Sequence, residues 1–241
     1  MPAVSFVIPA YNEARLLGKT LSAIEKAARA LRLTFEMIVV DDASVDGTPE
    51  IARAHGARVV SVNFRQIAAT RNAGARAAAG AWLVFVDADT IISEMLLRDA
   101  IAALKAGAVG GGCVVRFDEP VPRYGRVLIA LILPVYRALG LAAGCFLFCT
   151  RQAFDAVGGF DEKLFAAEEA VISRALGRLG RFVLLRTAVV TSARKLRVHS
   201  GREILGTLLR LAVTGPKAVR QRAGLELWYG ERRADPEIRD G

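Results

Sequence analysis

The stretch Trp82–Thr90, WLVFVDADT, sets five apolar residues directly before two aspartates that are one residue apart. The run is rich in β-branched and aromatic residues, which predicts a strand buried on both faces of a sheet. Open α/β sheets bind ligands at the carboxyl ends of such strands, where Asp87 and Asp89 fall. Two carboxylates at this spacing suit Mg²⁺ or Mn²⁺, and such a metal suits a diphosphate. The alternative is that both aspartates only cap the following turn.

Strands and helices alternate on both sides of this stretch. Short apolar runs predict strands at 4–8, 35–40, 59–62, 82–86 and 108–115. Apolar residues at helical spacing predict helices at 16–31, 49–55 and 71–79, and a further helix capped by Ser93. The alternation is typical of right-handed βαβ units, so we expect an α/β fold with a mostly parallel sheet flanked by helices.

The second half of the chain is less regular. A loop is expected at 116–123, which holds two prolines, and strands are expected at 145–149 and 182–185. Helices are expected at 127–141, at 151–157, from Glu168 onward and at 201–213. No repeat or low-complexity linker divides the chain. We therefore expect one domain, 1–233, with halves 1–115 and 116–233, followed by a frayed tail, 234–241.

The net charge of +9 is concentrated near the carboxyl end of the chain. Residues 194–233 hold ten Lys or Arg against three Glu, a balance of +7. Such a cluster suggests a partner with phosphates, which could be a sugar nucleotide, a phospholipid surface or nucleic acid. Trp228 and Tyr229 are the only aromatic residues there, so base stacking is poorly supported and no nucleic-acid partner is expected. A solvated basic face is the plainer alternative.

The cysteines and the apolar runs give information about the cellular compartment and about contact with a membrane. Three cysteines without a metal-binding or disulfide spacing predict a reducing environment, and the chain enters its first strand without a signal peptide. A cytoplasmic location is therefore expected. Residues 127–149 approach the length of a membrane span, but Arg137, Pro134 and two glycines interrupt them. Peripheral contact with a membrane surface remains open.

Polar side chains also follow the first two predicted strands. Residues 9–13 end the first strand, and Asp41 and Asp42 end the second. Because the carboxyl ends of parallel strands share one edge, these acids should converge with Asp87 and Asp89. Grouped acids repel one another unless a cation or hydrogen-bond donors compensate. The pattern therefore indicates a binding site, although turn formation alone would also account for Asp41.

Two residues near that edge suit a nucleotide. Asp42 could accept hydrogen bonds from a base or ribose, and Arg71 could reach a phosphate. No G-x-G-x-x-G follows the first strand and no G-x-x-x-x-G-K-[ST] occurs, which disfavours a Rossmann site and a P-loop.

Glu168 and Glu169 open a predicted helix just after a Gly-Gly-Phe-Asp turn. Acids are common in a first helical turn, where the helix dipole favours negative charge. Two adjacent acids at this place also suit a general base acting on an acceptor hydroxyl.

Four blocks of the chain together resemble the family 2 glycosyltransferases with the A-type nucleotide-sugar fold. They are 4–17 (VSFVIPAYNEARLL), 39–48 (VVDDASVDGT), 71–90 (RNAGARAAAGAWLVFVDADT) and 158–176 (GGFDEKLFAAEEAVISRAL). They occur in the order found in the family and, with the segment after them, cover residues 4 to about 195. The segment 191–195 (TSARK) is similar to a Ser-x-Arg-Arg segment of a small bacterial branch.

The resemblance implies an inverting transferase that uses a UDP- or GDP-sugar and Mg²⁺ or Mn²⁺. It implies donor contacts from Pro9, Ala10, Tyr11, Glu13, Asp42, Arg71, Asp87, Arg194 and Lys195. Asp87 and Asp89 would hold the metal, with His199 a candidate third ligand. Glu169 would be the base.

The chain departs from the family pattern at this base, since Glu169 stands where the family usually has Asp. Either the acceptor differs or Glu168 is the base. The acceptor itself is unknown, and a lipid-linked one would make the protein a polyprenyl-phosphate glycosyltransferase. A basic, non-catalytic binding module is the remaining alternative.

Overall fold

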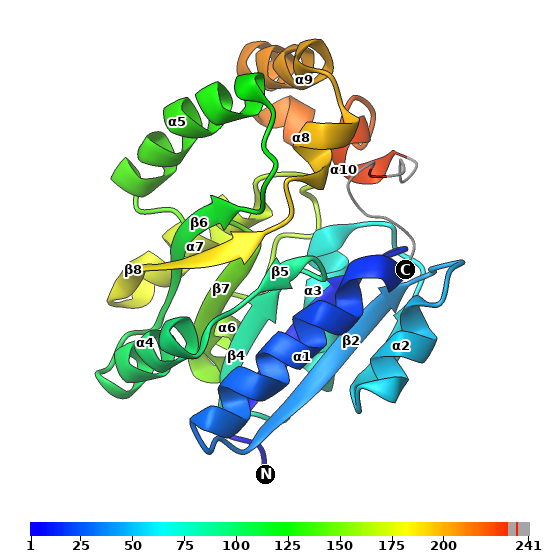
Figure 1. Cartoon of the computed structure of the whole chain (residues 1–241). Coiled ribbons are helices and arrows are strands. Elements are labelled where there is room, and N and C mark those ends of the chain that lie inside the picture. Colours follow the sequence, from blue (N-terminus) through cyan, green and yellow to red (C-terminus); the bar gives the residue numbers. More distant parts are fainter. Residues whose placement is uncertain (231–234, 236–241) are drawn as a thin grey trace.

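The strand predicted at 82–86 is β4 (Trp82–Val86), and it lies near the middle of the sheet. The computed structural model describes residues 1–230 and 235, and within them eight strands form one curled sheet (Figure 1). The other strands are β1 (Val4–Ala10), β2 (Phe35–Asp42), β3 (Arg58–Val62), β5 (Thr90–Ile91), β6 (Gly110–Phe117), β7 (Phe146–Thr150) and β8 (Phe182–Thr191). Their order is β3-β2-β1-β4-β7-β6-β8-β5.

The sheet is parallel in its first half and mixed in its second. β3, β2, β1 and β4 are parallel neighbours, as predicted, and β6 and β8 are also parallel. β7 inserts between β4 and β6 and is antiparallel to both, and the short β5 is antiparallel to β8. The α/β prediction is confirmed, but the parallel pattern ends where β7 enters the sheet from the opposite direction.

Helices cover both faces of the sheet. The apolar core on one face includes residues of α1 (Ala14–Ala30), α2 (Thr48–Ala54) and α4 (Glu94–Lys105). The core on the other face includes residues of α3 (Ile67–Ala77), α6 (Arg151–Ala156) and α7 (Glu168–Leu179). β1 alternates between them, with Phe6 on the first side and Val7 on the second. α3 packs closely on β1, because a Cβ at Gly74 would lie 2.3 Å from Val7 Cγ1.

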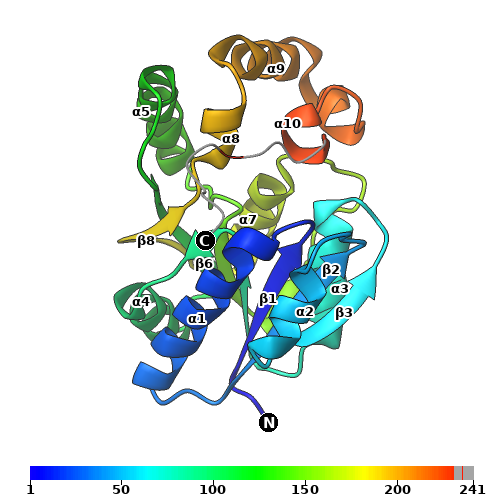
Figure 2. The ribbon, with the colours of Figure 1, turned by 45° about the vertical axis from the view of Figure 1, so that its right-hand side comes forward.

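The remaining helical segments gather at the end of the molecule toward which β1 runs (Figures 1 and 2). They are α5 (Arg123–Ala138), α8 (Arg194–Val198), α9 (Gly201–Thr214), the 3₁₀ helix η1 (Gly215–Arg220) and α10 (Glu226–Tyr229). Among the described residues, no helix combines the length and the apolar character that crossing a membrane requires.

Several predicted boundaries were wrong. α3 begins at Ile67 rather than Arg71, because the Gln66 side chain accepts a hydrogen bond from Ala69 N and caps the helix there. β8 continues to Thr191, where it pairs with Phe117 of a longer β6, so the predicted loop is shorter. The predicted helix 127–141 is shifted to Arg123–Ala138. The Ser93 cap is confirmed by its hydrogen bond from Leu96 N.

The predicted tail is contradicted at the one position that the structure describes. Asp235 is buried, and its Oδ2 accepts from Arg197 Nη2 at 2.7 Å. The other residues of 234–241 lie outside the described part of the chain.

Candidate active site

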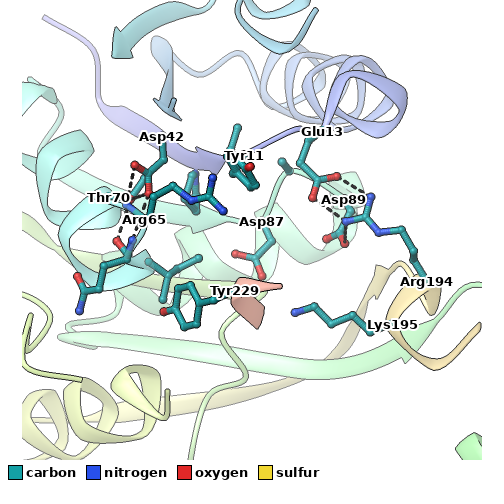
Figure 3. A pocket seen from close by; sticks show the side chains of 15 residues that line it. Tyr11, Glu13, Asp42, Arg65, Thr70, Asp87, Asp89, Arg194, Lys195 and Tyr229 are labelled. Carbon is teal, nitrogen blue, oxygen red and sulfur yellow. Dashed lines mark hydrogen bonds and ion pairs between the residues drawn. The ribbon is translucent and has the colours of Figure 1, made fainter. Parts of the chain in front are cut away.

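A cavity lies at the edge of the sheet where β1, β2 and β4 end (Figure 3). Nine of the residues predicted to bind donor or metal line it, namely Pro9, Ala10, Tyr11, Glu13, Asp42, Asp87, Asp89, Arg194 and Lys195. The residues that sequence reasoning missed are Arg65, Gln66, Ile67, Thr70, Ala88 and Tyr229. Arg71, Glu168, Glu169 and His199 do not line it. The expected convergence of strand ends is therefore present, with α8 and α10 completing the walls.

Asp42 shapes the floor of the cavity by holding the segment that leads into α3. Its Oδ1 accepts from the N–H groups of Phe64 at 2.7 Å and Arg65 at 2.9 Å. Its Oδ2 accepts from Gln66 N at 3.2 Å and from the Thr70 hydroxyl at 3.0 Å. The carboxylate thus already accepts four hydrogen bonds from its own chain, and its contact with a base or ribose remains a prediction.

Tyr11 forms a flat wall of the cavity together with Arg65. The guanidinium carbon of Arg65 lies 3.3 Å from the centroid of the Tyr11 ring, which is stacking contact. Tyr229 reaches the same cavity from α10, and its hydroxyl donates to the carbonyl of Phe165 at 2.8 Å. Neither Arg65 nor Tyr229 has a sequence signal, because both depend on segments that meet only in the fold.

Glu13 and Arg194 form a buried bidentate pair at the other end of the cavity. Arg194 Nη1 donates to Glu13 Oε2 at 2.9 Å and Nη2 to Oε1 at 2.6 Å. Burial alone would lower the pKa of Arg194, but its hydrogen bonds to Glu13 leave the pKa raised. Arg194 Nη2 also lies 3.8 Å from Asp89 Oδ2. Glu13 therefore positions the guanidinium of Arg194 beside Asp89, a role that the sequence did not predict.

Asp87 and Asp89 both reach the cavity, as Figure 3 shows. Their side chains are 31% and 19% exposed, so neither is turned into the core. Asp87 Oδ1 accepts from Arg71 Nη2 at 2.9 Å, and Asp89 Oδ1 lies 3.4 Å from the hydroxyls of Thr90 and Thr191. Two partly exposed hard-oxygen ligands fit Mg²⁺ or Mn²⁺, which proteins commonly hold with one or two carboxylates plus substrate phosphates.

His199 is not brought to these aspartates. Its Nδ1 lies 3.8 Å from Glu203 Oε1, on the first turn of α9. Across residues 1–230 and 235, no group of three or more His, Cys, Asp or Glu side chains is arranged to hold a metal. A metal ligated wholly by side chains, with His199 as third ligand, therefore finds no support.

Arg71 links the Asp-x-Asp to the predicted base helix. Its Nη1 donates to Glu168 Oε1 at 2.7 Å, and its Nη2 donates to Asp87 Oδ1 and to the carbonyl of Gly144 at 2.8 Å. The side chain is 3% exposed. Burial alone would lower the pKa of Arg71, but the charges of Asp87 and Glu168 raise it overall. Arg71 therefore connects Asp87 to Glu168 without lining the cavity, and its contact with a donor phosphate remains a prediction.

Glu168 and Glu169 open α7, as predicted, but they lie in different environments. Glu168 is buried and held by Arg71, whereas Glu169 is half-buried and its carboxylate accepts a hydrogen bond from its own backbone N–H. Burial raises the pKa of Glu169 to about 8, and the neighbouring charge of Glu168 adds to the rise. Only the ionised form of this carboxyl group can take a proton from a hydroxyl, and that form is populated as the pH rises toward about 8. The geometry favours Glu169 over Glu168 for that role.

The sequence was also compared with known proteins. Residues 5–159 match the model of glycosyl transferase family 2. Validoxylamine A glucosyltransferase of Streptomyces hygroscopicus subsp. jinggangensis is 33% identical over 131 residues, which are 51% of this chain and 31% of the relative. Undecaprenyl-phosphate 4-deoxy-4-formamido-L-arabinose transferase of Pseudomonas fluorescens is 34% identical over 162 residues, 62% of this chain and 47% of the relative. The chain thus spans less than half the length of these relatives.

Solved structures share the fold at low sequence identity. The mannosyltransferase PcManGT of Pyrobaculum calidifontis, in complex with GDP-Man and Mn²⁺, superposes with a TM-score of 0.68 at 22% identity. That match covers 91% of this chain and 65% of the mannosyltransferase. TarS of S. aureus, in complex with UDP-GlcNAc, gives a TM-score of 0.62 at 20% identity over 79% of this chain and 58% of the TarS chain.

Proposed function

The chain belongs to glycosyltransferase family 2, and from this premise we propose that it transfers a sugar from a UDP- or GDP-sugar to an acceptor hydroxyl with inversion. The observation that carries the proposal is the cavity that joins Asp87 and Asp89 to Arg194 and Lys195. Anionic and cationic groups side by side suit a metal–diphosphate complex, whose two parts carry opposite charges. The same cavity argues against a basic module that has no catalytic site.

The donor would lie along the cavity with its base near Tyr11 and Asp42 and its diphosphate near Arg194 and Lys195. UDP-GlcNAc and GDP-Man in the complexes of the two structural neighbours support these donor classes. Asp87 and Asp89 would hold Mg²⁺ or Mn²⁺, which neutralises negative charge on a departing diphosphate. Arg194, held in place by Glu13, would add a fixed positive charge beside the same group.

Glu169 would take the proton from the acceptor hydroxyl. The acceptor oxygen would then attack the anomeric carbon, and the bond from that carbon to the phosphate oxygen would break on the opposite side. The nucleoside diphosphate leaves with the bonding electrons, and the configuration inverts. Arg71 would support this arrangement, since it neutralises Glu168 and leaves Glu169 to act as the base.

A polyprenyl-phosphate acceptor is the second candidate, favoured by the relatives that use undecaprenyl phosphate. The two candidates differ in their need for a base. A phosphate oxygen is already ionised at neutral pH, whereas a hydroxyl must lose a proton during attack. The raised pKa of Glu169, a value suited to a general base, favours the hydroxyl.

A thermal-shift screen with UDP, GDP and their sugars, each with and without Mn²⁺, tests the proposal. Saturation at about 100 times Kd adds about 2.7 kcal/mol, which raises the Tm of a chain of this size by about 5–10 °C. Asp89→Asn should lose the part of the shift that depends on Mn²⁺. If no nucleotide or nucleotide sugar shifts the Tm, with or without metal, the proposed donor site is wrong.

A further inference from the structure

The exposed face of α5 is apolar along most of the helix. Among the side chains that the structure describes between Val127 and Leu139, the exposed ones are Val127, Ala130, Leu131, Pro134, Val135, Ala138 and Leu139. The four larger side chains in this set are between 54% and 65% exposed. A helix on a protein surface normally presents polar side chains to water. A continuous apolar stripe of this kind indicates a surface that binds another protein or a membrane.

The second helix at this end of the molecule adds to the same surface. On α9, Leu205 and Leu209 are one turn apart and are 51% and 56% exposed. Tyr124 at the start of α5 connects the two helices, because its ring would lie 3.2 Å from a Cβ at Gly201, the first residue of α9. Figures 1 and 2 both show α5 and α9 at the end of the molecule away from the N-terminus. We name the exposed apolar side chains of these two helices the docking face.

The charges around the docking face are almost all positive. The sequence has no Asp or Glu between residues 121 and 154, nor between 204 and 225. Arg123 is exposed at the start of α5, and Arg202 and Arg210 are exposed beside the leucines of α9. Glu203 is the acid on the described part of α9, and its side chain caps the same helix by accepting from Ser200 N. A partner that fits must be apolar in the middle and anionic around it.

We propose that the docking face binds the surface of an anionic lipid bilayer, with α5 and α9 lying in the plane of the headgroups. Amphipathic helices bind membranes in this way, with apolar side chains in the acyl boundary and Arg or Lys at the phosphates. A second copy of the chain fits less well, because pairing this face with itself would bring its arginines together. The inference does not depend on the proposed reaction.

Membrane docking would also place the cavity beside the lipid surface. Arg194 and Lys195, which line the cavity, belong to α8, the segment directly before α9. Tyr124 donates its hydroxyl to the carbonyl of His199 at the end of α8, so α5 and α8 are held together. A lipid-linked acceptor in the bilayer would therefore meet the enzyme near its donor.

Flotation of the full chain with lipid vesicles tests the inference. Vesicles of equal parts phosphatidylglycerol and phosphatidylcholine are compared with pure phosphatidylcholine. The variant Leu131→Gln with Val135→Gln changes two exposed residues, so the fold should be kept, which Tm measurement checks. The matched control, Met95→Gln with Leu179→Gln, changes two residues of similar exposure, 58% and 50%, on α4 and α7.

We expect the wild-type chain and the control to float with anionic vesicles, and the docking-face variant to bind at least about tenfold more weakly. Binding to pure phosphatidylcholine should be weaker than to the anionic mixture. The inference is overturned if the wild-type chain does not float, or if the docking-face variant floats as well as the control. A dimer in light scattering that the same variant dissociates would assign the face to a second copy and would also overturn it. Nucleotide-induced Tm shifts on the same samples report separately on the donor site.

Discussion

Arg71 on α3 donates to Glu168 at the start of α7 across 2.7 Å, although the two residues lie 97 positions apart in the chain. Both side chains are buried, at 3% and 6% exposure. The same guanidinium holds Asp87, so one cation fixes the Asp-x-Asp strand against the helix that carries Glu169. The relative position of the proposed metal site and the proposed base thus depends on this one side chain.

Replacing Arg71 with Met should therefore lower the free energy of unfolding by about 3–5 kcal/mol, because the buried Glu168 and the partly buried Asp87 lose the cation that they share. Urea denaturation measures the change. The matched control is Arg76→Met on the same helix, whose pair with Glu162 spans 3.7 Å and is largely exposed. That control should change stability by less than about 1 kcal/mol. Equal losses in the two variants would show that the Arg71 pairs contribute little.

Glu169→Gln should reduce kcat for sugar transfer by about 10²–10⁴-fold, because the amide cannot take the acceptor proton. Nucleotide affinity should stay unchanged, since Glu169 does not line the cavity. Glu162→Gln is the matched control, because Glu162 lies in the segment before α7 and its side chain is 49% exposed. Initial rates and nucleotide titrations on the same preparations make the comparison. A Glu169→Gln enzyme with near-normal kcat would instead point to a phosphate acceptor or to Glu168.

The pH profile should follow the ionisation of the same group. The pKa of Glu169 is raised to about 8 by burial and by the charge of Glu168, and only its ionised form can act as base. The value of kcat/KM should therefore rise with pH up to about 8 and then level off, an apparent pKa that belongs to the Glu168–Glu169 pair. A flat profile between about pH 6 and 9 would rule out a base with this pKa.

The same shift has a consequence for stability. The folded chain holds the Glu169 proton more tightly than the unfolded chain does, so this contribution is fully present below the ordinary carboxyl pKa. It is lost as the pH rises through about 8. Glu169→Gln carries no titrating group there, and its stability should fall less than that of the wild type over this range. Unfolding midpoints measured across the range compare the two chains.

The sequence predicted what depends on strand ends and local periodicity. Asp87 and Asp89 follow from a buried strand that stops at an acid pair, and the meeting of Asp42 with them follows from parallel order. The sequence could not indicate that β7 runs antiparallel, since apolar runs carry no direction. It also could not indicate that Arg71 contacts Asp87 and Glu168, because a cation next to the acid-rich edge could equally meet a ligand or the acids themselves.

Residues brought in from far along the chain were the hardest to foresee. Tyr229 and Arg65 line the cavity only because α10 and the segment before α3 meet above the sheet. No spacing or motif in the sequence indicates that these two segments lie next to each other. Glu13 was assigned to the donor because it follows the first strand, but its partner, Arg194, lies 181 positions later.

Glu13→Gln should weaken Mn²⁺ binding without removing either aspartate. In the wild-type chain, both Glu13 oxygens accept from Arg194, while Arg194 Nη2 stays 3.8 Å from Asp89 Oδ2. Without the charge of Glu13, Arg194 should pair with Asp89 and compete with the metal. Loss of such a supporting residue typically costs about 10–100-fold in metal affinity. Titrating Mn²⁺ into the nucleotide-bound chain and recording the Tm at each concentration measures the Mn²⁺ affinity.

The control for that titration is Glu25→Gln on α1, whose partner Arg29 is exposed, and neither residue lines the cavity. Its Mn²⁺ affinity should match the wild type. Nucleotide affinity measured without metal should be kept in Glu13→Gln, because Arg194 stays in the cavity with Asp89 in place of Glu13 as its partner. A Glu13→Gln chain that loses nucleotide and keeps Mn²⁺ affinity would reverse the assignment, since Glu13 would then contact the donor directly. A loss of Mn²⁺ affinity alone therefore indicates that Glu13 orients Arg194, whereas a loss of nucleotide affinity alone indicates that Glu13 binds the nucleotide.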